Sequence, residues 1–148
     1  MAKFVVDVSL LIELRQRRQL GMLTRPIARG QIVVPYYVLK KLRKPWWRDW
    51  LDRNESRVVA HLVTEEEHIT YAELLTKFAA PESNPKLSDD DLMAIAIARC
   101  RDLPLAIRDN NAERVARGLG VRVVHLDEFL IELRGPPAGQ THLFDRDV

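Results

Sequence analysis

Short apolar runs alternate with longer segments of helical pattern along most of this chain. The apolar runs predict strands over Phe4–Val6, Gln31–Val34, Leu103–Ile107 and Val121–Val124, while the run from Val58 to Val63 fits either a strand or a buried helix. The intervening pattern predicts helices over Leu10–Leu20, Tyr36–Arg43, Trp46–Leu51, Glu65–Phe78, Asp89–Arg101, Asn111–Arg117 and Asp127–Leu133. Strands that alternate with helices in this way predict an α/β domain with a mainly parallel sheet.

Capping and breaking residues set the expected boundaries. Thr64 and Glu67 have the spacing of a capping box, and Ser88 can cap the next helix. The Gly- and Pro-rich string that begins at Gly135 predicts the end of the folded part. We therefore expect one domain over residues 1–134 and a flexible tail over 135–148, with the tail's Asp145-Arg146-Asp147 as a solvated charge run.

Composition excludes some classes of protein and leaves others open. A chain of 148 residues is long enough for one domain with its own core, and a net charge of +2 is too small to indicate nucleic-acid binding by itself. The single Cys100 excludes an internal disulfide and a thiolate metal cluster. The sequence shows neither a signal-peptide core nor an apolar run of membrane-spanning length. These features predict a soluble, cytoplasmic protein without a membrane partner.

Three aspartates stand where an α/β chain can bring carboxylates together. Asp7 and Asp109 follow predicted strands, and Asp91 lies at the start of a predicted helix. Open α/β sheets place their sites outside the carboxyl ends of the strands, and carboxylates crowded there need a cation or a proton between them. Each of the three can also serve only as a helix cap or a favourable charge at a helix N-terminus. The pattern alone does not choose among the acids Asp89 to Asp91.

Four motifs occur in an order and spacing that resemble the PIN-domain family, which includes toxins of the VapC type and PIN-TRAM proteins. The motifs are Asp7-Val8-Ser9, the strand and Pro-led segment from Ile32 to Leu39, Leu87-Ser88-Asp89-Asp90-Asp91, and Ile107-Arg108-Asp109-Asn110-Asn111 followed by Gly120 and the strand after it. The resemblance covers residues 4 to 133. Each motif alone is weak, and their combination is what points to the family.

The resemblance implies a three-layer α/β/α fold around a central, mainly parallel sheet, and a Mg²⁺- or Mn²⁺-dependent endoribonuclease. Asp7, Asp91 and Asp109 then hold the metal directly or through water, and Ser9 and Asn111 orient the carboxylates. The metal would lower the pKa of a bound water and neutralise phosphate oxygens. The implied setting is the toxin of a toxin–antitoxin pair, with RNA as substrate, an antitoxin protein as partner and a homodimer as a common assembly.

Two departures from the family pattern bear on activity. Lys41 occupies the position where the family usually has a glutamate, and Ile107-Arg108 replaces the usual Thr-x before the late aspartate. Glu73 or Glu13 can supply a substitute acid. The alternative is a degenerate PIN-like module that binds RNA or a protein without cutting.

A basic and aromatic segment offers a candidate RNA contact. Lys40, Lys41, Arg43 and Lys44 precede Trp46 and Trp47, a mixture that can pair with phosphates and stack on bases. The same segment is equally compatible with a partner surface or with tryptophans packed into the core. The four histidines show no metal-ligand spacing.

Overall fold

The computed structural model describes residues 3–35, 44–60, 63–79 and 87–134. Several sequence predictions concern residues outside these ranges: the helix over 36–43, part of the apolar run over 58–63, and the tail over 135–148. The prediction of a separate flexible tail is therefore not tested by the described residues.

The described segments alternate between strands and helices, as the sequence pattern predicts. In chain order they are β1 (Phe4–Val6), α1 (Val8–Gln16), the 3-10 helix η1 (Leu20–Leu23), α2 (Thr24–Ala28), β2 (Ile32–Pro35), α4 (Pro45–Val58), β3 (Val59–Ala60), α5 (Glu65–Phe78), α6 (Asp89–Arg101), β4 (Leu105–Ala106), α7 (Asn110–Gly118), β5 (Val123–Val124) and α8 (Leu126–Arg134). Over the described ranges, no helix has both the length and the apolar character that a bilayer crossing requires.

The strands form one parallel sheet. Five strands of the described chain lie in the order β3-β2-β1-β4-β5, and every pairing between neighbours is parallel. Val5 of β1 lies opposite Val33 of β2 on one side and Leu105 of β4 on the other. All carboxyl ends therefore meet at one edge, which we call the carboxyl edge; the opposite one is the amino edge.

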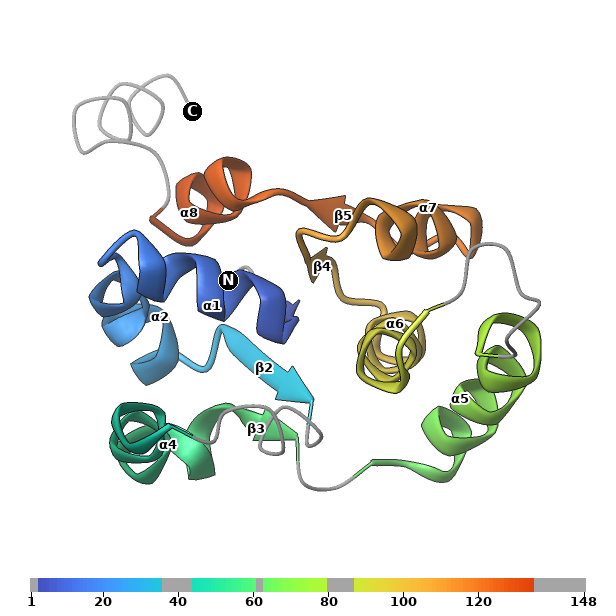
Figure 1. Cartoon of the computed structure of the whole chain (residues 1–148), viewed down its shortest axis with the longest axis horizontal. Helices are drawn as coiled ribbons and strands as arrows, with labels where there is room; N and C mark the ends of the chain where they lie inside the picture. Colours follow the sequence, from blue (N-terminus) through green and yellow to red (C-terminus); the bar gives the residue numbers. More distant parts are fainter. Residues whose placement is uncertain (1–2, 36–43, 61–62, 80–86, 135–148) are drawn as a thin grey trace, which may run out of the picture.

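Two helical layers cover the two faces of this sheet (Figure 1). Successive side chains of β1 point to opposite faces of the sheet, because Phe4 and Val6 belong to one core cluster and Val5 belongs to the other. The first cluster packs α1, η1, α2, α4 and α8 against the sheet, and the second packs α5, α6 and α7. This is the three-layer α/β/α arrangement with a parallel sheet that the sequence resemblance predicts.

The first helix is shorter than predicted. The pattern predicts helix as far as Leu20, but α1 ends at Gln16 because Arg18 adopts the left-handed conformation (φ 58°). The N–H of Arg18 then bonds the Arg15 carbonyl oxygen (3.1 Å) and the N–H of Gln19 bonds that of Leu14 (2.8 Å). These two bonds form a Schellman motif, which usually has glycine at the left-handed position. Because Arg18 stands where glycine is usual, no local stop signal marks the end of α1.

The fourth helix is longer than predicted. The sequence predicts a short helix over Trp46–Leu51, whereas α4 runs from Pro45 to Val58. Its Trp47 and Leu51 are buried in the first core cluster, and the polar residues that follow carry little apolar signal. The ambiguous apolar run divides, since Val58 ends α4 and Val59–Ala60 forms β3.

Candidate functional site

The strand order changes direction between β1 and β4. From β1 the chain moves outward through β2 to β3, and it then returns to add β4 and β5 on the other side. Open α/β sheets bind ligands in the crevice outside the carboxyl ends of the strands at such a switch point. Asp7 directly follows β1, and Asp109 lies just beyond β4. Two of the predicted acids thus follow the two strands that flank the switch point, and we call the region outside these two strand ends the crevice.

Asp7 is held in place by the first turn of α1. Its Oδ2 accepts hydrogen bonds from the Ser9 backbone N–H (3.2 Å) and from the Ser9 hydroxyl (2.8 Å). Its own N–H donates to the Ala106 carbonyl oxygen (3.0 Å), which fixes the end of β1 against β4. Only 1% of Asp7 is exposed. A carboxylate buried to this extent needs hydrogen bonds or a cation to replace its lost hydration.

Ser9 connects the two sides of the crevice. Its hydroxyl donates to Asp7, and its Oγ accepts a longer bond from the backbone N–H of Arg108 (3.4 Å). One hydroxyl therefore orients the Asp7 carboxylate and contacts the segment between β4 and Asp109. This geometry agrees with the orienting role that the resemblance implies for Ser9.

Asp109 is the N-cap of α7. Its Oδ1 accepts a hydrogen bond from the Ala112 N–H (2.9 Å), and the residue is exposed. Asn111 lies in the first turn of the same helix and is also exposed. Helix α7 starts at Asn110, one residue earlier than the sequence predicts. The cap fixes Asp109 at the mouth of the crevice.

Asp91 lies in the first turn of α6 and is half-buried. The Ser88 Oγ accepts a hydrogen bond from the Asp91 N–H (3.3 Å), so Ser88 is the N-cap, as predicted. Helix α6 ends at Arg101 and the chain turns directly into the amino end of β4. A helix of this length extends about 20 Å, so its first turn lies toward the carboxyl edge of the sheet.

The described part of the chain holds no group of three or more His, Cys, Asp or Glu side chains that could hold a metal ion. Asp7, Asp91 and Asp109 are therefore not joined in one three-carboxylate cluster. The available donors at the switch point are carboxylate and hydroxyl oxygens, which suit hard cations such as Mg²⁺ and Mn²⁺. Mg²⁺ is usually held by one or two carboxylates and keeps several waters. The donor chemistry of Asp7 and Asp109 fits such an ion.

A polar hollow adjoins this crevice. It has a volume of about 380 Å³, and its polar lining comes from α1 and from the segments after β4 and β5: Glu13, Arg17, Arg108, Asn110, His125 and Asp127. Glu13, one of the predicted substitute acids, is only 8% exposed. Its Oε1 lies 2.8 Å from Nη2 of Arg17 and its Oε2 lies 3.6 Å from Nε of Arg108. Two arginines therefore neutralise Glu13.

His125 and Glu113 form a pair that the sequence analysis missed. Nε2 of His125 lies 2.8 Å from Oε2 of Glu113, whose other oxygen accepts from Arg117 at 3.0 Å. The hydrogen bond from His125 is the main cause that lowers the pKa of Glu113, and Arg117 adds to it. His125 directly follows β5. The rule that selected Asp7 and Asp109, a polar residue after a predicted strand, would also have selected His125.

Glu73, the other predicted substitute acid, lies elsewhere. It is exposed on α5 and lines a separate hollow of about 350 Å³ with Lys77, Arg99 and Leu119. Helices α5 and α6 run antiparallel, since Glu67 near the start of α5 pairs with Arg101 at the end of α6. No residue of the switch-point crevice or of its polar hollow lines this space.

The aromatic part of the basic segment is used in packing. Trp47 is buried in the first core cluster and contacts the ring of Trp46 (centroids 4.4 Å apart) and the ring of Trp50 (5.7 Å). The guanidinium of Arg15 lies over the Trp46 ring at 4.2 Å. These contacts favour the core interpretation for the tryptophans. Lys44 is exposed, and Lys40, Lys41 and Arg43 lie outside the described residues.

Comparisons with known proteins match at the level of fold. Neither a scan of protein-family models nor a search of curated proteins gives a match. Among solved structures, the crystal structure of FitAcB from Neisseria gonorrhoeae matches with a TM-score of 0.51 and 14% identity, over 81% of this chain and 95% of that chain. At this identity the likeness concerns the fold alone, and the chain has a PIN-like fold.

Proposed function

We propose that this chain is a metal-dependent endoribonuclease of the PIN type. The observation that carries the proposal is the position of Asp7 and Asp109 on the two sides of the switch point, with the Ser9 hydroxyl spanning the crevice between Asp7 and the Arg108 backbone. The strand order supports this choice, because Asp7 and Asp109 follow the two strands that flank the switch point, where open α/β sheets bind ligands. Fold and motif therefore support the same site.

The residues of the crevice have distinct roles in this proposal. Asp7 and Asp109, with Asp91 directly or through water, would hold Mg²⁺ or Mn²⁺. When bound, the ion would supply a more acidic water and charge neutralisation at the scissile phosphate. Ser9 keeps the Asp7 carboxylate in one orientation, as its two hydrogen bonds to Oδ2 require. The segment that carries Asp109 is positioned by the α7 cap.

The polar hollow provides cationic groups for the RNA backbone. Arg17 and Arg108 line it with guanidinium groups that are half or more exposed, and His125 lies at the same edge. Guanidinium groups bind phosphate oxygens in bidentate fashion, so they can hold a phosphodiester beside the crevice. Lys40, Lys41, Arg43 and Lys44 are proposed to extend this contact.

The proposed setting is a toxin–antitoxin pair. The sequence motifs support it, because the family that they resemble includes toxins of the VapC type. An antitoxin that covers the crevice would block access of RNA to Asp7 and Asp109. A homodimer and a cytoplasmic location remain predictions from the sequence.

A matched pair of variants tests whether Asp91 contributes to metal binding or only interacts with the dipole of α6. Asp89 and Asp91 share the first turn of α6, so both interact with the same helix dipole. We expect Asp91→Asn to lower the rate of RNA cleavage on the order of 100-fold, because it removes an oxygen donor from the metal environment. Asp89→Asn should change the rate by less than about twofold, since its loss affects only the dipole interaction. Initial rates of cleavage of a labelled RNA pool in Mn²⁺ measure both.

Equal losses in the two variants would contradict a specific role for Asp91. Thermal unfolding of both proteins serves as the control, because it shows whether a loss of cleavage reflects a loss of folded protein.

The alternative is a PIN-like module that binds RNA without cutting it. Two observations favour it: Lys41 replaces the usual glutamate, and Glu13 is already engaged by Arg17 and Arg108. The variant Lys41→Glu distinguishes the two functions. A large gain of cleavage over the native chain would mean that the native site is impaired. A native chain that cleaves RNA at least as fast as the variant would already have a complete site, and absence of cleavage by both proteins would favour the binding module.

A further inference from the structure

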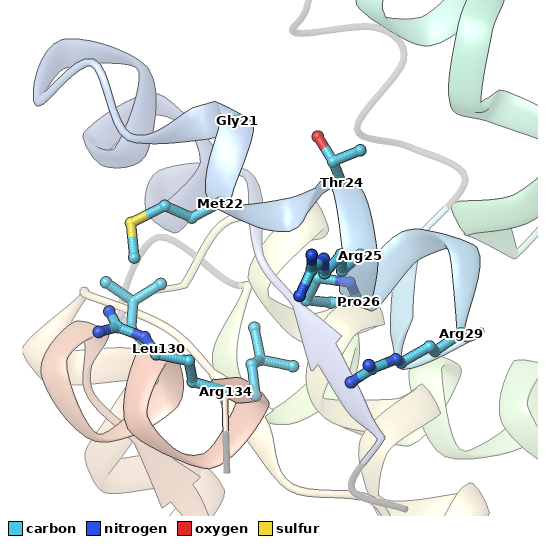
Figure 2. A pocket seen from close by; sticks show the side chains of 9 residues that line it. Gly21, Met22, Thr24, Arg25, Pro26, Arg29, Leu130 and Arg134 are labelled. Atoms are coloured by element: carbon cyan, nitrogen blue, oxygen red, sulfur yellow. The ribbon is translucent and has the colours of Figure 1, made fainter. Parts of the chain in front are cut away.

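A second groove lies away from the candidate site, between α2 and the end of α8 (Figure 2). It has a volume of about 400 Å³. Helix α8 begins beside the polar hollow, which Leu126 helps to line, and ends at Arg134, which lines this groove. The two spaces share no lining residue, and Leu126 of the hollow is about one helical turn, roughly 6 Å, from Leu130 of the groove. A ligand can occupy the groove without touching the crevice.

The groove combines an apolar floor with three cations. Met22, Pro26, Leu130 and Leu133 supply apolar surface, and Figure 2 shows the Met22 side chain extending toward Leu130. The cations are Arg25 and Arg29 from α2 and Arg134 from α8, all exposed.

In the described part of the chain, no carboxylate neutralises the cations of the groove. No acidic side chain lines the groove, and within the described ranges no carboxylate forms an ion pair with any of the three arginines. Like charges this close repel one another unless a counter-charge is added. The surface is therefore complementary to a segment that carries both carboxylates and apolar side chains.

We propose that the groove binds the C-terminal segment of the same chain, residues 143–148. Its sequence, Leu143-Phe144-Asp145-Arg146-Asp147-Val148, contains two aspartates on either side of one arginine, and three apolar side chains. The carboxylates match the arginines, and Leu143 and Phe144 match the floor around Met22. In this proposal Asp145 and Asp147 are not a freely solvated charge run, which is what their position in the tail suggests from sequence alone.

The connection between groove and segment is short. Arg134 lines the groove, and only residues 135–142 separate it from Leu143. At about 3.3 Å per residue these residues can span roughly 25 Å, enough to turn back to the groove from its own rim. A tether of this length gives an effective concentration in the millimolar range, so even weak contacts keep the segment bound much of the time.

Methionine methyl resonances of the full-length protein test the proposal. The chain has three methionines; Met22 lines the groove, and Met93 is fully buried in the other core cluster and serves as an internal control. We expect Phe144→Ala to move the Met22 methyl signal, through loss of the ring current, and to leave that of Met93 unchanged. Asp145→Asn with Asp147→Asn should move it in the same direction, and so should high salt.

A charge exchange provides the sharper measurement. Arg25→Glu with Arg29→Glu should release the segment, and adding Asp145→Arg with Asp147→Arg should restore the contact and the sensitivity of Met22 to Phe144→Ala. A Met22 signal that ignores every tail substitution would overturn the proposal. A Met22 signal that changes with protein concentration but not with tail substitutions would also overturn the proposal, because it would show that a second copy of the chain occupies the groove. If an added acidic peptide shifts the Met22 signal to saturation while tail substitutions leave that signal unchanged, the groove binds a partner protein and not the tail.

Discussion

Asp7→Asn should reduce RNA cleavage by 100-fold or more, on the order expected for loss of a metal-holding carboxylate, while the protein stays folded. Asparagine caps helices about as well as aspartate, and its carbonyl oxygen can still accept from Ser9. The substitution thus removes the negative charge at the switch point and keeps the start of α1 in place. Initial cleavage rates in Mn²⁺, together with thermal unfolding, measure the two effects separately.

Two further variants make this result specific. Ser9→Ala removes the hydroxyl that orients Asp7, and we expect an intermediate loss of about 10- to 100-fold, partly recovered at higher metal concentration. Asp102→Asn makes the same chemical change at a helix end near the amino edge of the sheet, where asparagine tolerates the left-handed conformation that Asp102 adopts (φ 52°). It should cleave at the native rate. If the Asp7→Asn protein cleaves RNA at the native rate, Asp7 is not part of the site.

Glu67→Gln should destabilise the fold by about 2 kcal/mol, because it replaces a charge-assisted contact with a neutral one. Glu67 is fully buried, and its carboxylate accepts from Nε and Nη2 of Arg101, each at 3.1 Å. Its Oε1 also accepts from the Thr64 N–H (3.1 Å), which completes a capping box. The pair joins the start of α5 to the end of α6. The expected loss is modest because the Arg101 side chain is 30% exposed, so water screens part of its interaction with Glu67.

The stability that Glu67 contributes should depend on pH. Burial alone would raise the pKa of Glu67, but the hydrogen bonds from Arg101 and Thr64 and the charge of Arg101 together hold it below the ordinary 4.5. A depressed folded-state pKa stabilises the fold above the ordinary value and loses that contribution as the pH falls through the folded-state value. The difference in unfolding free energy between native and Glu67→Gln proteins should therefore shrink below about pH 4.5.

Urea unfolding at several pH values measures this difference. Glu66→Gln is the matched control, since Glu66 lies one residue earlier in the same helix turn and is exposed. It should change stability by less than about 0.5 kcal/mol. A Glu67→Gln protein as stable as the native one, or a deficit that stays constant into acid, would show that the ion pair does not hold α5 against α6.

The local features of this fold are readable in the sequence because their causes are local. The alternation of Phe4, Val5 and Val6 between two core clusters follows from the period of a strand. The caps of α5 and α6 follow from Thr64 and Ser88, whose hydroxyls accept from the N–H groups of Glu67 and Asp91. Asp7 and Asp109 were selected as residues that follow strands, and the structure places both at the carboxyl edge.

Other features depend on residues far apart in the chain, and no local pattern carries them. The strand order that puts β1 beside β4 is one example. The neutralisation of Glu13 by Arg108 is another, because it joins α1 to the segment after β4. The early end of α1 was not predicted for a different reason, because Arg18 adopts a left-handed backbone conformation that glycine usually adopts.

The most direct test of the proposed function is cleavage of a mixed RNA pool by the purified full-length protein in Mg²⁺, in Mn²⁺ and in EDTA, with Asp109→Asn alongside. Asparagine preserves the α7 cap, so this variant should fold like the native chain. We predict cleavage that requires the metal and is lost in Asp109→Asn. Folded protein that is free of any co-purified inhibitor and cuts no RNA with either metal would contradict the nuclease proposal.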